Sequence, residues 1–156
     1  MKREATLFNN SYFDIQEVLF RFMRAFDTKE WDSINDCLAE TISYDYSSFR
    51  GEKPGRMLRT EYIAKRKADL ANLLTQHNLC NLSFNCSKET AEVTCNYTIY
   101  RFHPEFMGAK EHYFHSYGQY LFTLERDGSH WKISAITQKL LINDGNPELH
   151  GATRRK

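Results

Sequence analysis

Residues 11–26, with the sequence SYFDIQEVLFRFMRAF, carry the clearest secondary-structure pattern of the chain. Apolar side chains recur there at the three- and four-residue spacing of an amphipathic helix. These side chains are Ile15, Val18, Leu19, Phe22, Met23 and Phe26. The pattern predicts a helix with one apolar face, and that face needs a second layer of structure to cover it.

The rest of the chain continues with short helices and then with strands. Residues 31–38 and 60–74 have helical spacing, residues 42–46 alternate like a half-buried strand, and residues 49–59 contain glycine and proline and are expected to be a loop. Four further strands are expected near residues 77–87, 90–103, 112–126 and 131–142. Helices first and a strand meander afterwards predict an α+β fold, with N-terminal helices packed on a curved, mostly antiparallel sheet.

The length and charge of the chain exclude several classes of protein. A chain of 156 residues fits one domain, expected at residues 11–146, with tails at 1–10 and 147–156. The net charge is only +1, so no strong field attracts nucleic acid or an acidic membrane surface. We find no signal peptide and no transmembrane run, and we expect a cytoplasmic protein.

The side-chain chemistry indicates a small-molecule pocket. Aromatic residues make up 14% of the chain, and aromatic side chains often line ligand cavities. The four cysteines have no Cys-x-x-Cys spacing, the histidines have no helical metal-binding spacing, and the glycines form no phosphate-binding signature. We therefore expect no metal and no cofactor.

Four residues are candidates for an acid–base centre. Asp27 follows the apolar stripe of the first helix, Tyr46 closes the first strand, and His77 and His103 lie on separate predicted strands. His103 has the parity of the apolar residues in its strand and should face inward. His77 has the opposite parity to the apolar residues Leu82 and Phe84 and their neighbours, so either a twist or a bulge turns it inward or it lies on the convex face.

Each candidate also has an ordinary structural interpretation. Asp27 is either a solvated helix end, a cap for the next helix, or a buried partner of His103. Tyr46 is either a core tyrosine with a structural hydrogen bond or a donor to a substrate carbonyl. His103 is either a core histidine or a proton carrier, a role that suits imidazole because its pKa lies near working pH.

Several segments resemble the scytalone dehydratase family and the wider SnoaL-like group of the nuclear transport factor 2-like superfamily. The resemblance rests on residues 26–32 (FDTKEWD), 44–49 (YDYSSF) and 75–77 (TQH), continues at 100–103 and 128–133, and covers about residues 11–146. It implies a cone-shaped cavity between the helices and the sheet, lined by the four candidate residues.

The resemblance also implies roles for individual residues. His77 would remove a proton next to a carbonyl and help the hydroxyl leave, while His103 and Asp27 would support it and orient water. Tyr46 would polarise the carbonyl, and Phe26 stands where a second carbonyl-binding tyrosine is expected. Substrate contacts are expected from Phe26, Phe49, Tyr117 and Gln119, of which Tyr117 and Gln119 stand where the family has a serine and an asparagine.

The resulting hypothesis is a metal-free dehydratase or isomerase-type lyase that acts on a small, mostly apolar cyclic or aromatic hydroxy-ketone. The alternatives are a non-catalytic small-molecule-binding module of the same fold and an epoxide hydrolase of the same superfold. Apolar residues occur at both parities of the predicted strands, so both sheet faces need cover. We therefore expect a homo-oligomer, either a dimer or a trimer.

Overall fold

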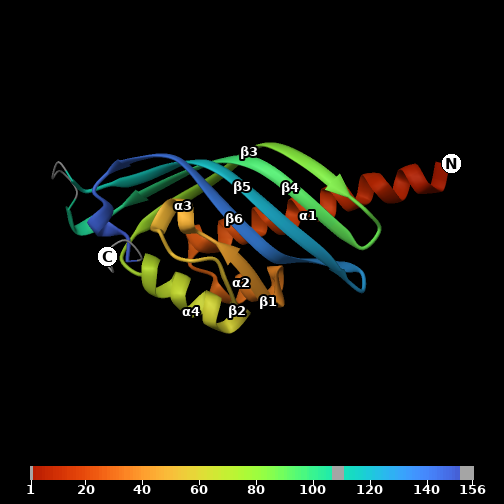
Figure 1. Cartoon of the computed structure of the whole chain (residues 1–156), viewed down its shortest axis with the longest axis horizontal. Coiled ribbons are helices and arrows are strands. Elements are labelled where there is room, and N and C mark those ends of the chain that lie inside the picture. The colour runs from red at the N-terminus through yellow and green to blue at the C-terminus, as the bar shows by residue number, and fades with distance from the viewer. Residues whose placement is uncertain (1, 107–110, 152–156) are drawn as a thin grey trace.

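Six strands form one sheet, and helices α1, α2 and α4 lie along one side of it (Figure 1). The computed structural model describes residues 2–106 and 111–151, with the backbone alone for residues 2–10. In chain order the elements are α1 (Lys2–Thr28), α2 (Trp31–Cys37), β1 (Leu38–Asp45), α3 (Ser47–Arg50), β2 (Gly55–Leu58), α4 (Arg59–Leu70), β3 (Leu74–Cys86), β4 (Thr90–Phe102), β5 (Phe114–Asp127) and β6 (His130–Gly145), with short 3₁₀ turns at Pro104–Phe106 and Pro147–Leu149. The strand order is β2-β1-β6-β5-β4-β3, and all neighbours are antiparallel except β1 and β6. The expected α+β class is confirmed.

Helix α1 supplies the apolar face that the sheet covers. All six apolar residues of its sequence pattern are buried, and burial of each such side chain contributes roughly 1.5–3 kcal/mol. The helix begins at Lys2, well before the expected residue 11. It ends where Lys29 adopts a left-handed backbone with φ 62° and Glu30 N donates to Ala25 O at 2.9 Å. This turn leads directly into α2.

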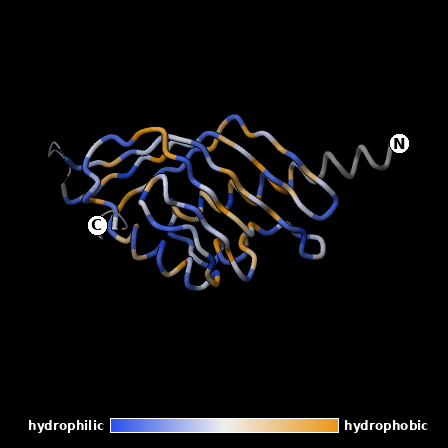
Figure 2. Tube along the Cα trace, viewed as in Figure 1, coloured by the Kyte–Doolittle hydropathy of each residue, from blue (hydrophilic) through white to orange (hydrophobic). Residues whose placement is uncertain are grey.

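The inner face of the sheet is built from alternate residues of its long strands. Along β4 every second side chain from Ala91 to Arg101 is buried, and Figure 2 shows the matching alternation of hydropathy along the strands. The polar residues Arg101 and Gln138 are also buried on this face. In the strand register Arg101 is paired with Thr75 of β3, and Gln138 is paired with Tyr120 of β5.

A bulge in β3 turns His77 toward the interior. Between Cys80 and Ser83 the strand gains one residue relative to β4, and Asn81 in this gap has φ 54°. One inserted residue reverses the face of every residue before it. His77 and Phe84 consequently face the same side, although their sequence parity differs. Of the alternatives that the sequence left open for His77, the bulge is confirmed.

Other segments also differ from the sequence prediction. Residues 47–50 form the short helix α3, and the helix expected at 60–74 ends at Leu70. Residues 55–58 form the edge strand β2 instead of a loop, and four residues beside a glycine and a proline are too few to give a recognisable alternation. The expected C-terminal tail returns to the core, since Leu149 and His150 are only 6% and 3% exposed. Residue 1 and residues 152–156 of the expected tails lie outside the described part of the chain.

The bulge can be tested with surface substitutions in β3. Asn81 is exposed, and a β-branched residue at its left-handed backbone should cost about 1–2 kcal/mol. Asn81→Val should therefore lower the free energy of unfolding in urea by that amount, while Asn81→Gly should change it by less than about 0.5 kcal/mol. Asn85→Val is the matched control, because Asn85 is exposed in regular strand and valine is favoured there. If Asn81→Val and Asn85→Val changed the free energy of unfolding by the same amount, that result would contradict the bulge at Asn81.

Candidate active site

The carboxylate of Asp27, near the end of α1, joins this helix to strand β3. Its Oδ1 accepts a hydrogen bond from Thr75 Oγ1 at 2.9 Å and lies 2.6 Å from His77 Nδ1, and its Oδ2 accepts from His77 backbone N at 2.8 Å. The helix dipole disfavours a carboxylate near a helix C-terminus. The three contacts with β3 hold it there and fix the position of the His77 ring.

The contact with Asp27 determines which nitrogen of His77 carries the proton. An aspartate is ordinarily ionised at neutral pH, so its oxygen accepts and Nδ1 of a neutral imidazole donates. Nε2 is then the unprotonated nitrogen. His77 lines the cavity between helices and sheet, while Asp27 lies behind it beside a surface pocket. The pair can therefore present a basic nitrogen to a molecule in the cavity.

Burial favours the neutral form of His77. Its side chain is 8% exposed, and removal from water lowers the pKa of His77 below its ordinary value. The hydrogen bond and charge of Asp27 act in the opposite direction, and the positive charge of Arg101 lowers the pKa further. Neutral imidazole is the form that can accept a proton from a substrate.

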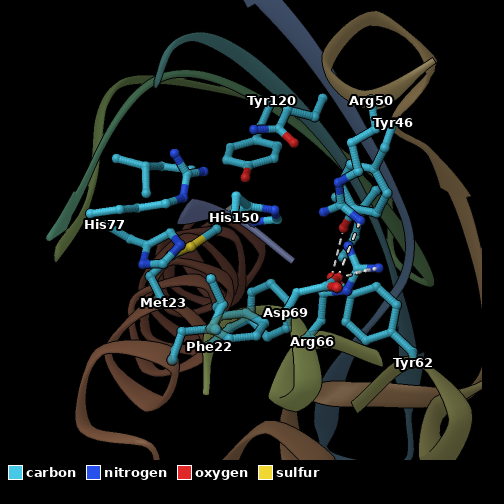
Figure 3. Close-up of a pocket in the computed structure, with 16 residues that line it drawn as sticks. Phe22, Met23, Tyr46, Arg50, Tyr62, Arg66, Asp69, His77, Tyr120 and His150 are labelled. Carbon is cyan, nitrogen blue, oxygen red and sulfur yellow. Dashed lines mark hydrogen bonds and ion pairs between the residues drawn. The ribbon is translucent and has the colours of Figure 1, made fainter. Parts of the chain in front are cut away.

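Two phenols, Tyr46 and Tyr62, lie across the cavity from His77 in Figure 3. Their hydroxyl oxygens are 2.6 Å apart, and both side chains are almost fully buried. Removal from water raises the pKa of each, so both hydroxyls keep their protons at neutral pH. One proton serves the bond between the two phenols, which leaves the other for donation to a ligand oxygen.

Three arginines and one aspartate also line the cavity. Arg50 Nη1 and Arg66 Nη2 lie 3.8 and 3.3 Å from Asp69 Oδ2, and Figure 3 shows this group beside the two phenols. The guanidinium carbon of Arg50 is 4.2 Å from the centre of the Tyr46 ring. The third arginine, Arg101, lies apart from this ion-pair group on β4.

His103 is buried on the same strand face as Arg101, as its parity predicted, but it does not belong to the residues that line the cavity. It follows the last residue of β4, one alternate position beyond Arg101. Asp27 contacts His77, whereas one of the alternatives from the sequence had made it a partner of His103. The structure thus brings Tyr46, His77 and Asp27 together around the cavity and leaves His103 outside its lining.

The substrate contacts expected on β5 face the wrong side of the sheet. Alternation along β5 buries Ser116 and Tyr120, so Tyr117 and Gln119 point to the outer face and border a surface hollow there. Tyr120 lines the cavity instead. The placement of Tyr117 and Gln119 in the pocket is therefore wrong, because it ignored strand parity.

The two phenylalanines expected at the substrate differ in position. Phe26 lines the cavity, with its ring centre 5.6 Å from that of His77. Phe49 is buried behind the lining, where its ring meets those of Phe114 and His150. Phe49 supports the cavity wall and does not belong to its surface.

Sequence reasoning missed Tyr62, Arg101 and His150 as cavity residues. Tyr62 lies in the segment 60–74, for which the sequence indicated only helical spacing. Arg101 has the same strand parity as His103, so parity alone could have found it. His150 gave no local signal, because it lies in a segment without periodicity; burial lowers the pKa of His150 well below its ordinary value.

The cavity is small, with a volume of about 40 Å³. A buried water needs roughly 10–15 Å³, so the space holds a few waters. Within residues 2–106 and 111–151, no group of three or more His, Cys, Asp or Glu side chains is placed to hold a metal ion. No helix in this described part of the chain is long and apolar enough to cross a membrane.

The fold and the enclosed polar cavity define a protein of the cone-shaped, helices-on-sheet class. The SnoaL-like domain family matches residues 10–137, and the chain belongs to this family. Within it the chain is similar to scytalone dehydratase-like protein claB of Passalora fulva, with 34% identity over 68 residues. That match covers 41% of this chain and 42% of the relative, so the chain matches less than half of that relative's length.

Solved structures agree with the fold. The protein Kfla4162 from Kribbella flavida superposes with a TM-score of 0.83 at 18% identity, over 87% of this chain and 94% of that one. A member of the NTF2-like family from Streptomyces avermitilis gives a TM-score of 0.73 at 15% identity, over 86% and 99% of the two chains. These likenesses show the nuclear transport factor 2-like fold that the sequence resemblance implied.

Burial of His77 and His150 predicts an acid-sensitive fold. The pKa values of His77 and His150 are lowered in the folded state, so between those values and the ordinary value of 6.5 the unfolded chain binds more protons. The free energy of unfolding should then have its full value above about pH 7, and it should decrease as the pH drops below 6.5. His150→Gln should reduce the slope of this fall in urea unfolding measured between about pH 5 and pH 7.5.

Substitution of an exposed histidine provides the control for this slope. His130 is exposed at the start of β6, and His130→Gln should leave the pH dependence as it is in the wild type. Carboxylates that titrate near pH 5 contribute equally to the pH dependence of both variants, so they do not affect the comparison. A slope in His150→Gln equal to that of the wild type would contradict the burial account.

Proposed function

We propose that this protein is a dehydratase-type lyase that eliminates water from a small cyclic or aromatic β-hydroxy ketone. The observation that carries the proposal is the 2.6 Å contact between Asp27 Oδ1 and His77 Nδ1 at the wall of a cavity that Tyr46 and Tyr62 also line. A base oriented by a carboxylate and a pair of phenol donors is the set of groups that enolisation needs. The similarity to a scytalone dehydratase-like protein supports the same reaction class.

The proposed reaction starts with proton removal by His77. Its Nε2 takes the proton from the carbon next to the carbonyl, and the electron pair of the broken C–H bond moves onto the carbonyl oxygen as an enolate. Asp27 accepts from Nδ1 of the imidazolium that forms and stabilises its charge. Burial, which lowers the pKa of His77, keeps the ring in the neutral form before this step.

The phenols serve the second half of the reaction. The free hydroxyl of the Tyr46–Tyr62 pair donates a hydrogen bond to the enolate oxygen, where charge develops, and keeps its proton. The enolate then collapses to the enone, the bond between the β-carbon and the hydroxyl oxygen breaks, and His77 returns its proton to the departing hydroxide as water. Tyr62 thereby supplies the second phenol, although Phe26 occupies the position expected for it.

The size of the cavity places a requirement on this proposal. Small-molecule sites commonly enclose roughly 300–1,000 Å³, and the volume here is about 40 Å³. A ring-sized substrate therefore has to displace lining side chains. The alternative, a binding module without turnover, requires the same movement and uses the same cavity.

Substitution of His77 tests the proposal most simply. His77→Ala should slow water elimination from a panel of cyclic β-hydroxy ketones by roughly 10²–10⁴-fold, the usual contribution of a positioned acid–base group. Enone absorbance measures the rate. Asp27→Asn should also slow it, and the double variant should lose less than the product of both effects, because the two residues act as one hydrogen-bonded unit.

Further variants separate the competing assignments. His103→Ala should cost less than His77→Ala, since His103 lies outside the cavity lining, and Tyr46→Phe should slow turnover by roughly 10²–10³-fold through loss of an oxyanion donor. His130→Ala is the surface control. A wild-type rate equal to buffer on every substrate, with ligands still bound, would favour the binding module. A larger loss from His103→Ala than from His77→Ala would contradict the assigned base.

We propose in addition that the outer face of the sheet packs against another subunit. Leu141 and Ile142 on β6 are 80% and 58% exposed there, beside the hollow bordered by Tyr117. Sedimentation should show a dimer or trimer at micromolar concentration, which Leu141→Lys dissociates. Leu58→Lys, on the edge strand β2, should not dissociate it. A wild-type monomer would contradict this assembly.

A further inference from the structure

Arg101 is a buried cation without an acidic partner within the described part of the chain. Only 2% of the residue is exposed, and no carboxylate of residues 11–105 or 111–151 lies within ion-pair distance of it. Arg50 and Arg66, the other two arginines of the cavity, both contact Asp69. An unpaired buried charge is costly, so buried charges are normally paired or hold a ligand.

The guanidinium of Arg101 is held in place by hydrogen bonds from one of its nitrogens, Nη1. Nη1 donates to Ser116 Oγ at 2.8 Å and to Phe114 O at 3.4 Å, and Ser116 Oγ in turn donates to Asn143 Oδ1 at 2.9 Å. The rings of Phe49 and Phe114 lie with their centres 5.4 Å from the guanidinium carbon. Nε has no hydrogen-bond partner among the described residues. The side chain is therefore fixed but incompletely satisfied.

The charge of Arg101 persists at neutral pH. Burial lowers the pKa of Arg101 to about 10, which still leaves it protonated. Arg50 lies 3.8 Å from both Glu52 and Asp69, and Arg66 pairs with Asp69. The positive charge in excess at the cavity lining is therefore that of Arg101. A neutral substrate would leave this excess without compensation, whereas an anionic one would compensate it.

The register of the sheet places Arg101 next to the proposed base. His77 pairs with Ile99, and Arg101 is two residues further along the same face of β4. Such diagonal neighbours are separated by roughly 7–8 Å. Both side chains line the same cavity, so one small molecule can meet Arg101 with its carboxylate and His77 with a nearby carbon.

We propose that Arg101 binds a carboxylate of the substrate, so that the enzyme acts on acidic hydroxy-ketones. The inference rests on the proposed function, because it names the substrate class of the same cavity, and it revises the expectation of an apolar substrate. Arg101 is the residue that selects the acid, and its planar guanidinium matches a carboxylate. Ser116 and Asn143 are the positioning residues behind it.

Binding of simple anions tests this inference without any turnover. Acetate fits the small cavity, and benzoate tests a ring; acetamide and benzamide are their neutral counterparts of similar shape. In solution NMR titrations, wild-type protein should bind each acid at least roughly tenfold more tightly than its amide. Arg101→Gln should weaken acid binding by at least roughly 30-fold, as expected when one partner of a buried charge pair is removed.

Two further variants complete the binding experiment. Arg126→Gln removes an equal charge on the far part of the sheet, where Arg126 contacts Trp131, and should leave acid binding unchanged. Arg101→Lys keeps the cation, and it should retain part of the preference for acids even if Arg101→Gln fails to fold. Equal affinity of wild-type protein for acids and amides, or an unchanged preference in Arg101→Gln, would overturn the inference.

Turnover separates this inference from the proposed function. 3-Hydroxycyclohexanone should be a poorer substrate than its ring carboxylate, and the ratio of the two kcat/KM values should approach one in Arg101→Gln. Elimination from both ketones at equal rates in wild-type protein would leave the proposed function standing and overturn the acidic substrate. Preference for acetate and benzoate without elimination from any ketone would support the anion site and overturn the dehydratase.

Discussion

The contact of the Asp27 carboxylate with strand β3 is the interaction on which the site depends. Three donors from Thr75 and His77 converge on it, and they compensate for its unfavourable position near a helix C-terminus. The same contact orients the His77 ring and ties the last turn of α1 to the first residues of β3. Loss of these bonds would release the helix end and the base together.

The cavity combines an apolar frame with polar groups that contact one another. Tyr46 and Tyr62 bond to each other, and Arg50 and Arg66 share Asp69. Buried polar groups that satisfy each other are rigid, and rigid donors can stabilise charge without reorganisation. Arg101 differs from Arg50 and Arg66 because no carboxylate among the described side chains lies within ion-pair distance of it, which is why we assign it to the substrate.

Much of the fold was predictable, because it follows from local periodicity. The stripe of α1, the short α2 and the four long strands all have clear patterns, and a bulge was one of the alternatives that the parity of His77 left open. Edge strand β2 was not predictable, since its four residues pair only with β1 and leave no pattern of their own. The position of His150 was not predictable either, because its burial depends on tertiary packing of the chain end.

The candidate site was predictable in its principal residues and less so in their partners. Motif resemblance and parity brought His77 and Tyr46 to the cavity, but the identity of the Asp27 partner depends on how the end of a helix meets a strand. Such a contact between residues 27 and 77 has no signature in sequence spacing. The misplacement of Tyr117 had a different cause. The family motif was transferred to this position without a check of which face of the strand the side chain occupies.

The protonation state of the His77 ring tests the central claim most directly. Long-range ¹H–¹⁵N NMR correlation spectra of imidazole-labelled protein at neutral pH distinguish the two tautomers and the imidazolium. The account predicts a neutral ring with the proton on Nδ1 and an unprotonated Nε2, and a change of this signature in Asp27→Asn. A ring protonated on Nε2 at neutral pH would contradict the account, because no basic nitrogen would then face the cavity.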